Sequence, residues 1–309
     1  MIENSKIFVL SFLAVFSLSF FANILYSRAG DFFWASQMSE APAGFFIADI
    51  SETFQGKKIA NKDCSLSAQS AVAVFVNQDG GSKIVFEKNA CERRPIASLS
   101  KLMSAVIANE FYQPTDEIKV SRKAVSQEES FGQLSVGEKF TVSNLLLMAL
   151  NESSNDAAYA LTAPMGIDGF IGLMNLKTQE LELASTYFYN PHGLEPNGDS
   201  QEINYSTAYE MAQLAKYILE KPRLLEIMGW HSAPVYFADG RFHHNALNTN
   251  LLLAENERVM AGKTGFAEQA GECLLVISRS YLEDSYYINV VLGSKDRFGD
   301  MRKVIECYN

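Results

Sequence analysis

The pattern of apolar and polar positions predicts strands at both ends of the globular part of the chain and helices in its middle. Residues 71–77 and 83–87 are rich in β-branched and aromatic side chains, and turn residues separate them, so they predict a hairpin. From Ser98, and again between about 120 and 230, apolar residues recur at helical spacing with Gly, Pro or Asn interruptions. Late apolar runs predict strands at residues 259–264, 273–278 and 286–292, and a closing helix at residues 296–307.

This order of elements predicts an α+β fold, because the strands cluster at the two ends and do not alternate with helices. A lone hairpin is barely stable, so the first two strands must pair with the late strands in one antiparallel sheet. We expect helices to flank this sheet and the remaining helices to form an all-helical lobe. A cleft between the sheet and that lobe is where a ligand would bind.

An uncharged apolar segment precedes the globular part and is long enough, at residues 7–26, to cross a bilayer as a helix. Its length favours an uncleaved signal-anchor over residues 7–27, with residues 1–6 in the cytoplasm. A cleaved signal peptide is the alternative, since Ser27 and Ala29 are small residues of the kind that precede a cleavage site. Under both interpretations the rest of the chain is exported.

Beyond this segment, residues 28–65 show no clear periodicity and are interpreted as a linker, so the globular domain covers residues 66–309. Hydrophobic residues make up 48% of the chain, which excludes disorder along its whole length. The formal net charge of −10 argues against a nucleic-acid partner, because phosphate binding requires clustered cations.

Export permits disulfides among the four cysteines, Cys64, Cys91, Cys273 and Cys307. Cys64 and Cys91 flank the predicted hairpin and could meet across it, whereas Cys273 lies in an apolar strand and equally suits a buried small residue. The pairing stays open, because four cysteines allow three pairings. The histidines have no metal-ligand spacing, so we expect neither a metal nor a cofactor.

Ser98 and Lys101 form an S-x-x-K motif at the predicted start of a helix. Positions i and i+3 share one helix face, so the hydroxyl and the amine can touch. A hydroxyl needs a nearby base to become a strong nucleophile, and a lysine whose pKa is lowered by burial or by another cation can be that base. Alone the motif is weak evidence, since about one S-x-x-K per 300 residues is expected by chance.

Two further motifs follow. Ser153 and Asn155 form an S-x-N between two predicted helices, where a second hydroxyl can relay a proton and a carboxamide can hold a lysine and a substrate amide. Lys263, Thr264 and Gly265 form a K-T-G on a predicted strand. There the lysine adds positive potential that attracts a substrate carboxylate, the threonine can bond that carboxylate, and the glycine lets a substrate backbone lie close. Each motif falls in the structural context that its chemistry requires.

With these motifs, residues 66–309 resemble the serine D-Ala-D-Ala carboxypeptidases, the low-molecular-mass penicillin-binding proteins of peptidase S11 type. The stretches that carry the resemblance are ERRPIASLSKLMSA, ESSNDAA, NPHGL, NTNLLL, GKTGFAEQAGECLL and KDRFGD. The resemblance implies a β-lactamase/transpeptidase-like fold and the removal of the terminal D-Ala from peptidoglycan stem peptides in the bacterial cell envelope. It also implies acylation by penicillins and other β-lactam antibiotics.

The resemblance further implies roles for individual residues. Ser98 is the acylated nucleophile, Lys101 its base, and Ser153 and Asn155 the relay and the clamp. Lys263, Thr264 and Gly265 bind the substrate carboxylate and backbone. The backbone N–H groups of Ser98 and Phe266 stabilise the oxyanion. His192 and Arg297 lie at the border of the site. For His192 and Arg297, a loop anchor and a solvated helix-start charge are the alternatives.

Some features depart from the family pattern. Position 154 is Ser where Gly or Ala is usual, which could narrow the site. Many relatives add a β-rich domain and a C-terminal amphipathic anchor, whereas this chain ends at Asn309, so we expect the N-terminal segment to be its only membrane attachment.

Three other functions were weighed. A D,D-endopeptidase that cuts peptidoglycan crosslinks would use the same motifs. A β-lactamase is disfavoured, because residues 179–189 lack the E-x-x-x-N that supplies a deacylating carboxylate. A non-catalytic peptidoglycan-binding protein would have lost Ser98, Lys101 or Lys263, and all three are present.

Overall fold

The computed structural model describes residues 64–127, 133–196 and 202–308. The predicted membrane segment at residues 7–27, its cytoplasmic flank and nearly all of the predicted linker lie outside the described residues. Across the part of the chain that is described, no helix combines the length and the apolar character needed to cross a bilayer.

A five-stranded antiparallel sheet forms the centre of the fold, with the strand order β2-β1-β11-β10-β9. Its strands are β1 (Ser70–Val76), β2 (Ser82–Lys88), β9 (Val259–Ala267), β10 (Gly271–Arg279) and β11 (Tyr286–Ser294). The N-terminal hairpin joins the late strands where β1 pairs with β11, with Val72 opposite Val290. The predicted antiparallel sheet is therefore confirmed, and its strand β9 lies at an edge.

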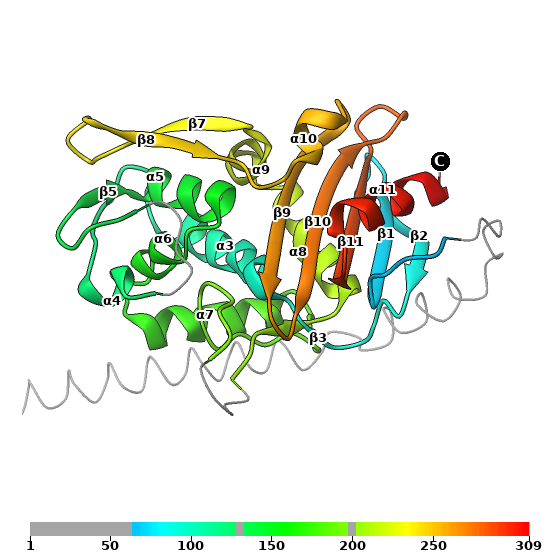
Figure 1. Ribbon diagram of the computed structural model, residues 1–309, viewed down its shortest axis with the longest axis horizontal. Coiled ribbons are helices and arrows are strands. Elements are labelled where there is room, and N and C mark those ends of the chain that lie inside the picture. Colours follow the sequence, from blue (N-terminus) through cyan, green and yellow to red (C-terminus); the bar gives the residue numbers. More distant parts are fainter. Residues whose placement is uncertain (1–63, 128–132, 197–201, 309) are drawn as a thin grey trace, which may run out of the picture. The chain divides into compact units, whose positions relative to one another are not determined.

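Helices pack on both faces of the sheet (Figure 1). Val290 and Val291 are neighbours on β11, and because strand side chains alternate, they enter different apolar clusters. Val291 packs in the cluster that includes Val304 of α11 (Arg297–Tyr308). Val290 packs in the main core with α8 (Ala208–Leu219). Both faces of the central strands are thus removed from water, which is why their sequences are nearly continuous apolar runs.

The second lobe is built around α3 (Lys101–Phe111), which is buried from Lys101 to Ala108. The other α-helices among the described residues are α4 (Arg122–Val125), α5 (Val142–Leu147), α6 (Asn155–Ala160), α7 (Ile167–Glu180), α9 (Pro222–Gly229) and α10 (Leu252–Glu255). A helix on the protein surface usually has one polar face. In contrast, α3 has an apolar or small residue at almost every position and is covered on all sides. This burial fixes the position of Lys101 at its first turn.

The lobe is not all-helical, so this part of the fold prediction is wrong. Two small antiparallel strand pairs belong to it: β4 (Glu117–Lys119) pairs with β5 (Lys139–Thr141), and β7 (Ser232–Tyr236) pairs with β8 (Phe242–Leu247) in a hairpin. A further pair joins β3 (Arg94–Pro95) to β6 (Tyr205–Ser206). Strands of two or three residues are too short to show a period of two, and so the sequence pattern did not reveal β3, β4, β5 or β6.

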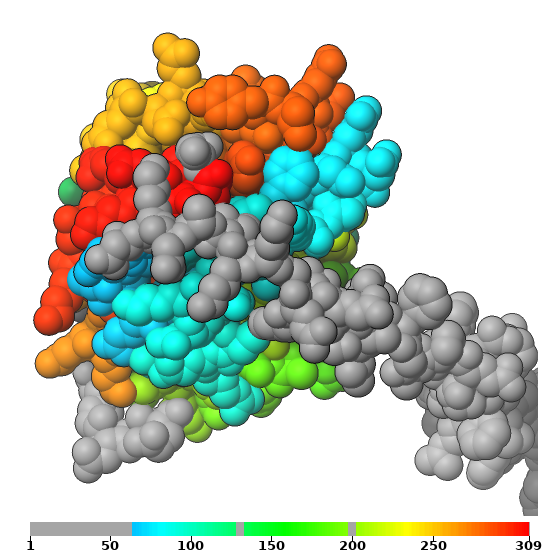
Figure 2. Space-filling model, turned by 90° about the vertical axis from the view of Figure 1, so that its right-hand side faces the viewer, coloured from blue at the N-terminus to red at the C-terminus, as the bar shows by residue number. Residues whose placement is uncertain are grey.

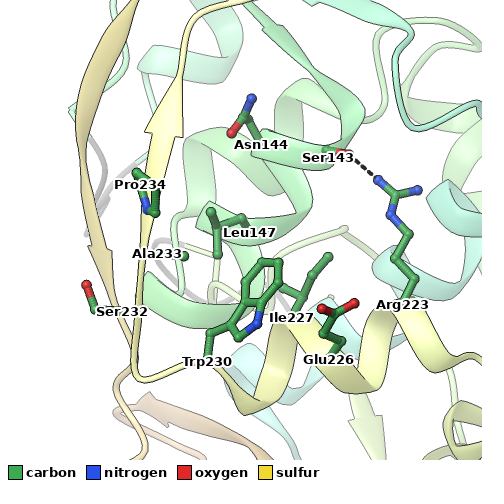
Figure 3. A pocket seen from close by; sticks show the side chains of 10 residues that line it. All are labelled: Ser143, Asn144, Leu147, Arg223, Glu226, Ile227, Trp230, Ser232, Ala233 and Pro234. Atoms are coloured by element: carbon green, nitrogen blue, oxygen red, sulfur yellow. Dashed lines mark hydrogen bonds between the residues drawn. The ribbon is translucent and has the colours of Figure 1, made fainter.

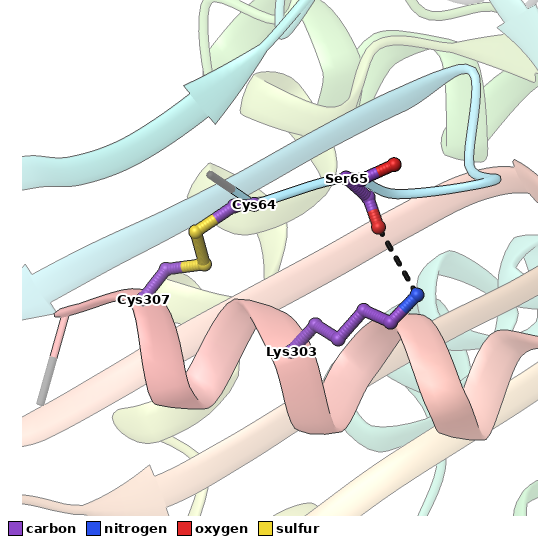
Figure 4. The surroundings of a disulfide bond; sticks show 4 residues. All are labelled: Cys64, Ser65, Lys303 and Cys307. Carbon is purple, nitrogen blue, oxygen red and sulfur yellow. Dashed lines mark hydrogen bonds between the residues drawn. A yellow bond between two sulfur atoms is a disulfide. The ribbon is translucent and has the colours of Figure 1, made fainter. Parts of the chain in front are cut away.

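A disulfide joins Cys64 to Cys307 and ties the start of the described chain to the end of α11 (Figure 4). Beside it, Lys303 donates a hydrogen bond of 3.0 Å from Nζ to the carbonyl oxygen of Ser65. In Figure 2, atoms of α11 (red) lie beside the blue atoms near the start of the domain. The suggested meeting of Cys64 with Cys91 is wrong: Cys91 is a free, exposed thiol, and Cys273 is free and buried.

Candidate active site

Ser98 lies in a short 3-10 turn, η2 (Ala97–Ser100), that leads directly into α3. Lys101 donates a hydrogen bond of 2.7 Å from Nζ to Ser98 Oγ, so the two residues of the S-x-x-K motif meet as the helical spacing predicted. Ala97, just before Ser98, has φ +46°, a left-handed conformation that is strained for any residue with a side chain. Such strain is typical of turns that present a reactive side chain.

The ammonium of Lys101 is completely buried and has three acceptors. Besides Ser98 Oγ, it donates to Asn155 Oδ1 at 2.7 Å and to the carbonyl oxygen of His192 at 2.8 Å. A charged lysine has three N–H donors, and each of these three atoms accepts from it. When Lys101 loses a proton, its nitrogen can accept a hydrogen bond, and of these three partner atoms only the Ser98 hydroxyl can become the donor. A neutral Lys101 is thereby placed to receive the Ser98 proton.

The S-x-N motif follows a π-helical turn, η3 (Met148–Glu152). Ser153 ends this turn in the left-handed conformation with φ 65°, which reverses the chain and allows α6 to begin at Asn155. Ser154 Oγ accepts a hydrogen bond of 3.2 Å from the backbone N–H of Ala157 and caps α6. Ser154 is fully buried, and its hydroxyl is engaged in this cap.

The K-T-G motif lies on the edge strand β9, against the turn that holds Ser98. A Cβ added to Gly265 would lie 3.1 Å from the backbone nitrogen of Ser98 and 3.2 Å from the carbonyl oxygen of Ile96. Any larger residue at position 265 would press against this backbone, so glycine suits the close packing of the strand against η2. Thr264 Oγ1 lies 2.6 Å from Thr249 Oγ1, and the next residue, Phe266, has an exposed side chain.

Lys263 is almost completely buried, and its Nζ donates a hydrogen bond of 2.9 Å to the carbonyl oxygen of Thr264. Burial, and then the charge of Arg297, lower the pKa of Lys263 to about 7. Lys263 and Gly265 are two residues apart and so face the same side of β9, where Gly265 meets Ser98. A lysine with this pKa changes its charge near neutral pH, which bears on any anion that binds there.

His192 borders the site through its backbone, not through a charged ring. Its Nδ1 accepts a hydrogen bond of 3.1 Å from the backbone N–H of Leu194, so Nε2 carries the ring proton. Burial, and then the charge of Lys101, lower the pKa of His192 to about 3. A Cβ on the next residue, Gly193, would lie 1.9 Å from the carbonyl oxygen of Ala97, so the loop sits directly on the nucleophile turn.

Arg297 starts α11 and connects it to β9. Its Nη1 donates a hydrogen bond of 2.7 Å to the carbonyl oxygen of Gly265, and its Nη2 lies 3.2 Å from Glu272 Oε1 in an ion pair. Arg297 therefore holds the K-T-G strand in place and adds positive charge beside Lys263, in contrast to the solvated helix-start charge that was the alternative.

Sequence reasoning missed three residues that support the site. Thr249, which contacts Thr264, lies in the NTNLLL stretch that was singled out only as part of the resemblance. Glu152, directly before Ser153, has Oε1 2.8 Å from His244 Nε2 on β8. Glu272 anchors Arg297. No local pattern marks these partners, because each contact joins elements far apart in the chain.

Two of the three motifs are joined directly, since Lys101 contacts both Ser98 and Asn155. The third lies beside them through Gly265. The arrangement provides a hydroxyl with an adjacent buried amine, and a second amine behind it that titrates near neutral pH. Such a set can perform nucleophilic acyl transfer.

Comparison with known proteins gives consistent matches. The family model described as D-alanyl-D-alanine carboxypeptidase, Peptidase_S11, matches residues 57–296. The D-alanyl-D-alanine carboxypeptidase DacF of Bacillus subtilis is 28% identical over 274 residues, which cover 85% of this chain and 68% of that protein. The D-alanyl-D-alanine endopeptidase of Escherichia coli is 29% identical over 216 residues, which cover 68% of this chain and 67% of that protein.

Solved structures show the same fold. A DD-transpeptidase from Streptomyces superposes with a TM-score of 0.71 at 24% identity, covering 79% of this chain and 97% of that chain. A D-alanyl-D-alanine carboxypeptidase from Mycobacterium tuberculosis superposes with a TM-score of 0.71 at 21% identity, covering 79% of this chain and 91% of that chain.

Proposed function

The chain belongs to the D-alanyl-D-alanine carboxypeptidase family, peptidase S11, and we infer from this that it is a serine hydrolase that removes the terminal D-Ala from peptidoglycan stem peptides. The observation that carries the mechanism is the hydrogen bond of 2.7 Å between Lys101 Nζ and Ser98 Oγ in a buried site. We propose that Ser98 forms the acyl-enzyme.

In the first step Ser98 Oγ attacks the carbonyl carbon between the two terminal D-Ala residues. The hydroxyl proton moves to the neutral amine of Lys101, the partner placed to receive it. The backbone N–H groups of Ser98 and Phe266 would stabilise the oxyanion. When the tetrahedral intermediate collapses, the C–N bond breaks and the leaving amine takes a proton, relayed by Ser153. Water then hydrolyses the Ser98 ester and releases the shortened peptide.

The substrate carboxylate would be held at β9. Lys263 and Thr264 would bind it directly, and Gly265 would let the peptide backbone approach the strand. Arg297 lies 2.7 Å from the carbonyl oxygen of Gly265 and adds a second positive charge. His192, whose carbonyl oxygen holds Lys101, would act by positioning the base.

Benzylpenicillin tests the acyl-enzyme mechanism. Its β-lactam carbonyl should acylate Ser98, so intact-mass spectrometry of the full chain should show one covalent adduct that is absent from Ser98→Ala. Thr115→Ala, far from the three motifs in the sequence, serves as the matched control and should be acylated like the wild type. A wild-type protein that stays unmodified at concentrations that label relatives would refute the mechanism.

A second candidate is a D,D-endopeptidase that cuts peptidoglycan crosslinks. It is favoured by one observation, the match at 29% identity to a D-alanyl-D-alanine endopeptidase. Mass spectrometry of products from a linear pentapeptide and from crosslinked muropeptides separates the two activities. Loss of one alanine from the pentapeptide supports the carboxypeptidase, and cleavage of the crosslink alone supports the endopeptidase.

We also propose that the enzyme acts in the cell envelope, anchored through residues 7–27 with the catalytic domain outside the cytoplasm. The uncharged run of residues 7–26 supports this proposal. Cell fractionation followed by N-terminal sequencing tests it. Recovery of a full-length N-terminus in the membrane fraction supports the anchor, whereas a mature N-terminus near residue 30 in the soluble fraction would show cleavage.

A further inference from the structure

A cavity of about 650 Å³ lies between α5, α9 and strand β7, and its lining residues include none of the three motifs (Figure 3). Its apolar wall is formed by five side chains: Leu147, Ile227, Trp230, Ala233 and Pro234. Its polar lining side chains come from α5, from α9 and from Ser232 on β7. This volume falls within the range of about 300–1,000 Å³ that is typical of small-molecule sites, and the mixture of an apolar wall with a few polar groups is also typical.

One charged side chain that lines this cavity forms no ion pair among the described residues. Arg223 is half-buried on α9, and within the described residues it forms no ion pair with an acidic side chain. Its Nη2 donates a hydrogen bond to the neutral Ser143 Oγ. Burial lowers the pKa of the Arg223 guanidinium, as expected where no anion compensates its charge. Glu226, one turn later on α9, also lines the cavity.

We propose that this cavity is a second binding site, for a short peptide that carries a free carboxylate. The carboxylate would pair with Arg223, because a guanidinium presents two parallel N–H donors that match a carboxylate. The aliphatic body of the peptide would lie against Trp230 and its apolar neighbours. The identification of this peptide as a peptidoglycan stem peptide rests on the proposed function.

The size and the charges of the cavity favour a peptide over a single amino acid. One alanine would leave most of a cavity of this volume unfilled, whereas a few residues would cover the apolar wall. The negative charge of Glu226 repels a second anion on its side of the cavity and attracts an amine. The site therefore suits a peptide that has one carboxylate and N–H donors elsewhere. The C-terminal end of a peptidoglycan stem peptide, with its terminal carboxylate and its backbone N–H groups, has this chemistry.

The cavity is also connected to the candidate active site. The carbonyl oxygen of Trp230 accepts a hydrogen bond of 3.2 Å from Asn151 Nδ2, and Asn151 lies on η3, two residues before Ser153. The carbonyl oxygen of Asn151 accepts one of 3.0 Å from the backbone N–H of Thr249, the residue that contacts Thr264. A peptide that moves Trp230 therefore acts on backbone that supports both the S-x-N and the K-T-G motifs.

Trp230 provides a direct test, because the chain has two tryptophans and the other, Trp34, lies outside the described residues. In full-length Trp34→Phe protein, Ser98 is first acylated with benzylpenicillin, which blocks the active site. Tryptophan fluorescence is then titrated with diacetyl-L-Lys-D-Ala-D-Ala. We expect a saturable change, weakened about tenfold or more when the peptide is amidated at its C-terminus and by a similar factor in Arg223→Gln.

The outcomes are distinct. The carboxylate site is overturned if the fluorescence does not change saturably, or if the peptide acid and the peptide amide bind with equal affinity. This comparison of two peptides needs no variant at Arg223. Equal affinity for diacetyl-L-Lys-L-Ala-L-Ala would overturn its assignment to stem peptides. Glu226→Gln is the matched control on the same helix and should keep the preference for the acid. If benzylpenicillin fails to acylate Ser98, the proposed function fails. The second site is then decided in Trp34→Phe/Ser98→Ala, where adding Arg223→Gln should remove the preference for the acid; a preference that survives this change would overturn the second site.

Discussion

Lys101 and Lys263 are two buried lysines whose surroundings give them different tasks. Lys101 donates to three acceptors that include Ser98 Oγ, and in the proposed mechanism its neutral form would receive the Ser98 proton. Lys263 is held with its pKa at about 7 by burial and by Arg297, and its charged form is the one that would attract a carboxylate. The site therefore needs one lysine neutral and the other charged at the same pH.

We predict a bell-shaped pH profile of kcat/KM for peptide hydrolysis. The rate should rise with pH while Lys101 loses its proton, and should fall about tenfold per pH unit well above pH 7, where Lys263 becomes neutral. His192 contributes to neither limb, because its pKa of about 3 keeps it neutral throughout. Steady-state assays between pH 5 and pH 10 (about two to three units on each side of 7) measure the profile.

The control for the alkaline limb changes the substrate and leaves the protein intact. A substrate amidated at its terminal carboxylate has no anion for Lys263 to bind, so the fall above pH 7 should vanish. An alkaline limb that persists with the amide would show that another group causes it.

At the scale of elements, the hairpin β7–β8 supports the turn that carries Ser153. His244 on β8 contacts Glu152 on η3, and Glu152 Oε2 has no partner among the described residues. Burial raises the pKa of Glu152, and the hydrogen bond and charge of His244 oppose this rise without cancelling it. Ser153 needs such external support, because its left-handed backbone is unfavourable for a residue other than glycine.

We predict that His244→Ala destabilises the fold by about 1–3 kcal/mol, since it leaves a buried carboxyl group without a partner. It should also slow acylation by benzylpenicillin several-fold, because the segment before Ser153 loses an anchor. Thermal denaturation and the acylation rate measure the two effects.

Two variants make the hairpin prediction specific. Leu247→Ala, at an exposed position of the same strand, should change neither quantity. Glu152→Gln keeps a hydrogen-bonding group opposite His244 and should retain most of the acylation rate. A His244→Ala protein that matches the wild type in both measurements would show that the contact does not support the site.

At the scale of the whole molecule, α11 closes the sheet that the two ends of the domain build. Asp300 accepts hydrogen bonds of 2.6 Å from Ser67 Oγ, from the backbone N–H of Ala68 and from Ser294 Oγ. The disulfide between Cys64 and Cys307 adds a covalent tie a short distance away. Because Arg297 at the other end of α11 holds β9, the same helix links the start of the domain to the K-T-G strand.

We predict that loss of this disulfide lowers the free energy of unfolding by about 2–4 kcal/mol, because it closes a long loop in the unfolded chain. The variant Cys64→Ser/Cys307→Ser should show this in chemical denaturation, while its acylation by benzylpenicillin at low temperature stays close to that of the wild type. The free cysteine variant Cys91→Ser is the matched control, and a reducing agent should reproduce the loss only in proteins that contain both bridge cysteines.

The sequence by itself determined the family, the α+β sheet and the identity of the three motifs, because these depend on local patterns: alternating or continuous apolar runs, turn residues and short fixed spacings. Such patterns show which residues of a strand or helix face the core, because this depends only on residues a few positions apart in the chain.

Only the tertiary structure decided which distant groups meet. It selected the bridge between Cys64 and Cys307, placed the carbonyl oxygen of His192 on Lys101, and brought His244 to Glu152. It also decided that Arg223 faces a cavity without an acidic partner in the described residues. The residues in these contacts are separated along the chain by tens of residues up to almost the length of the domain. No local pattern encodes such contacts, because they depend on how the packed helices and the sheet are placed in space.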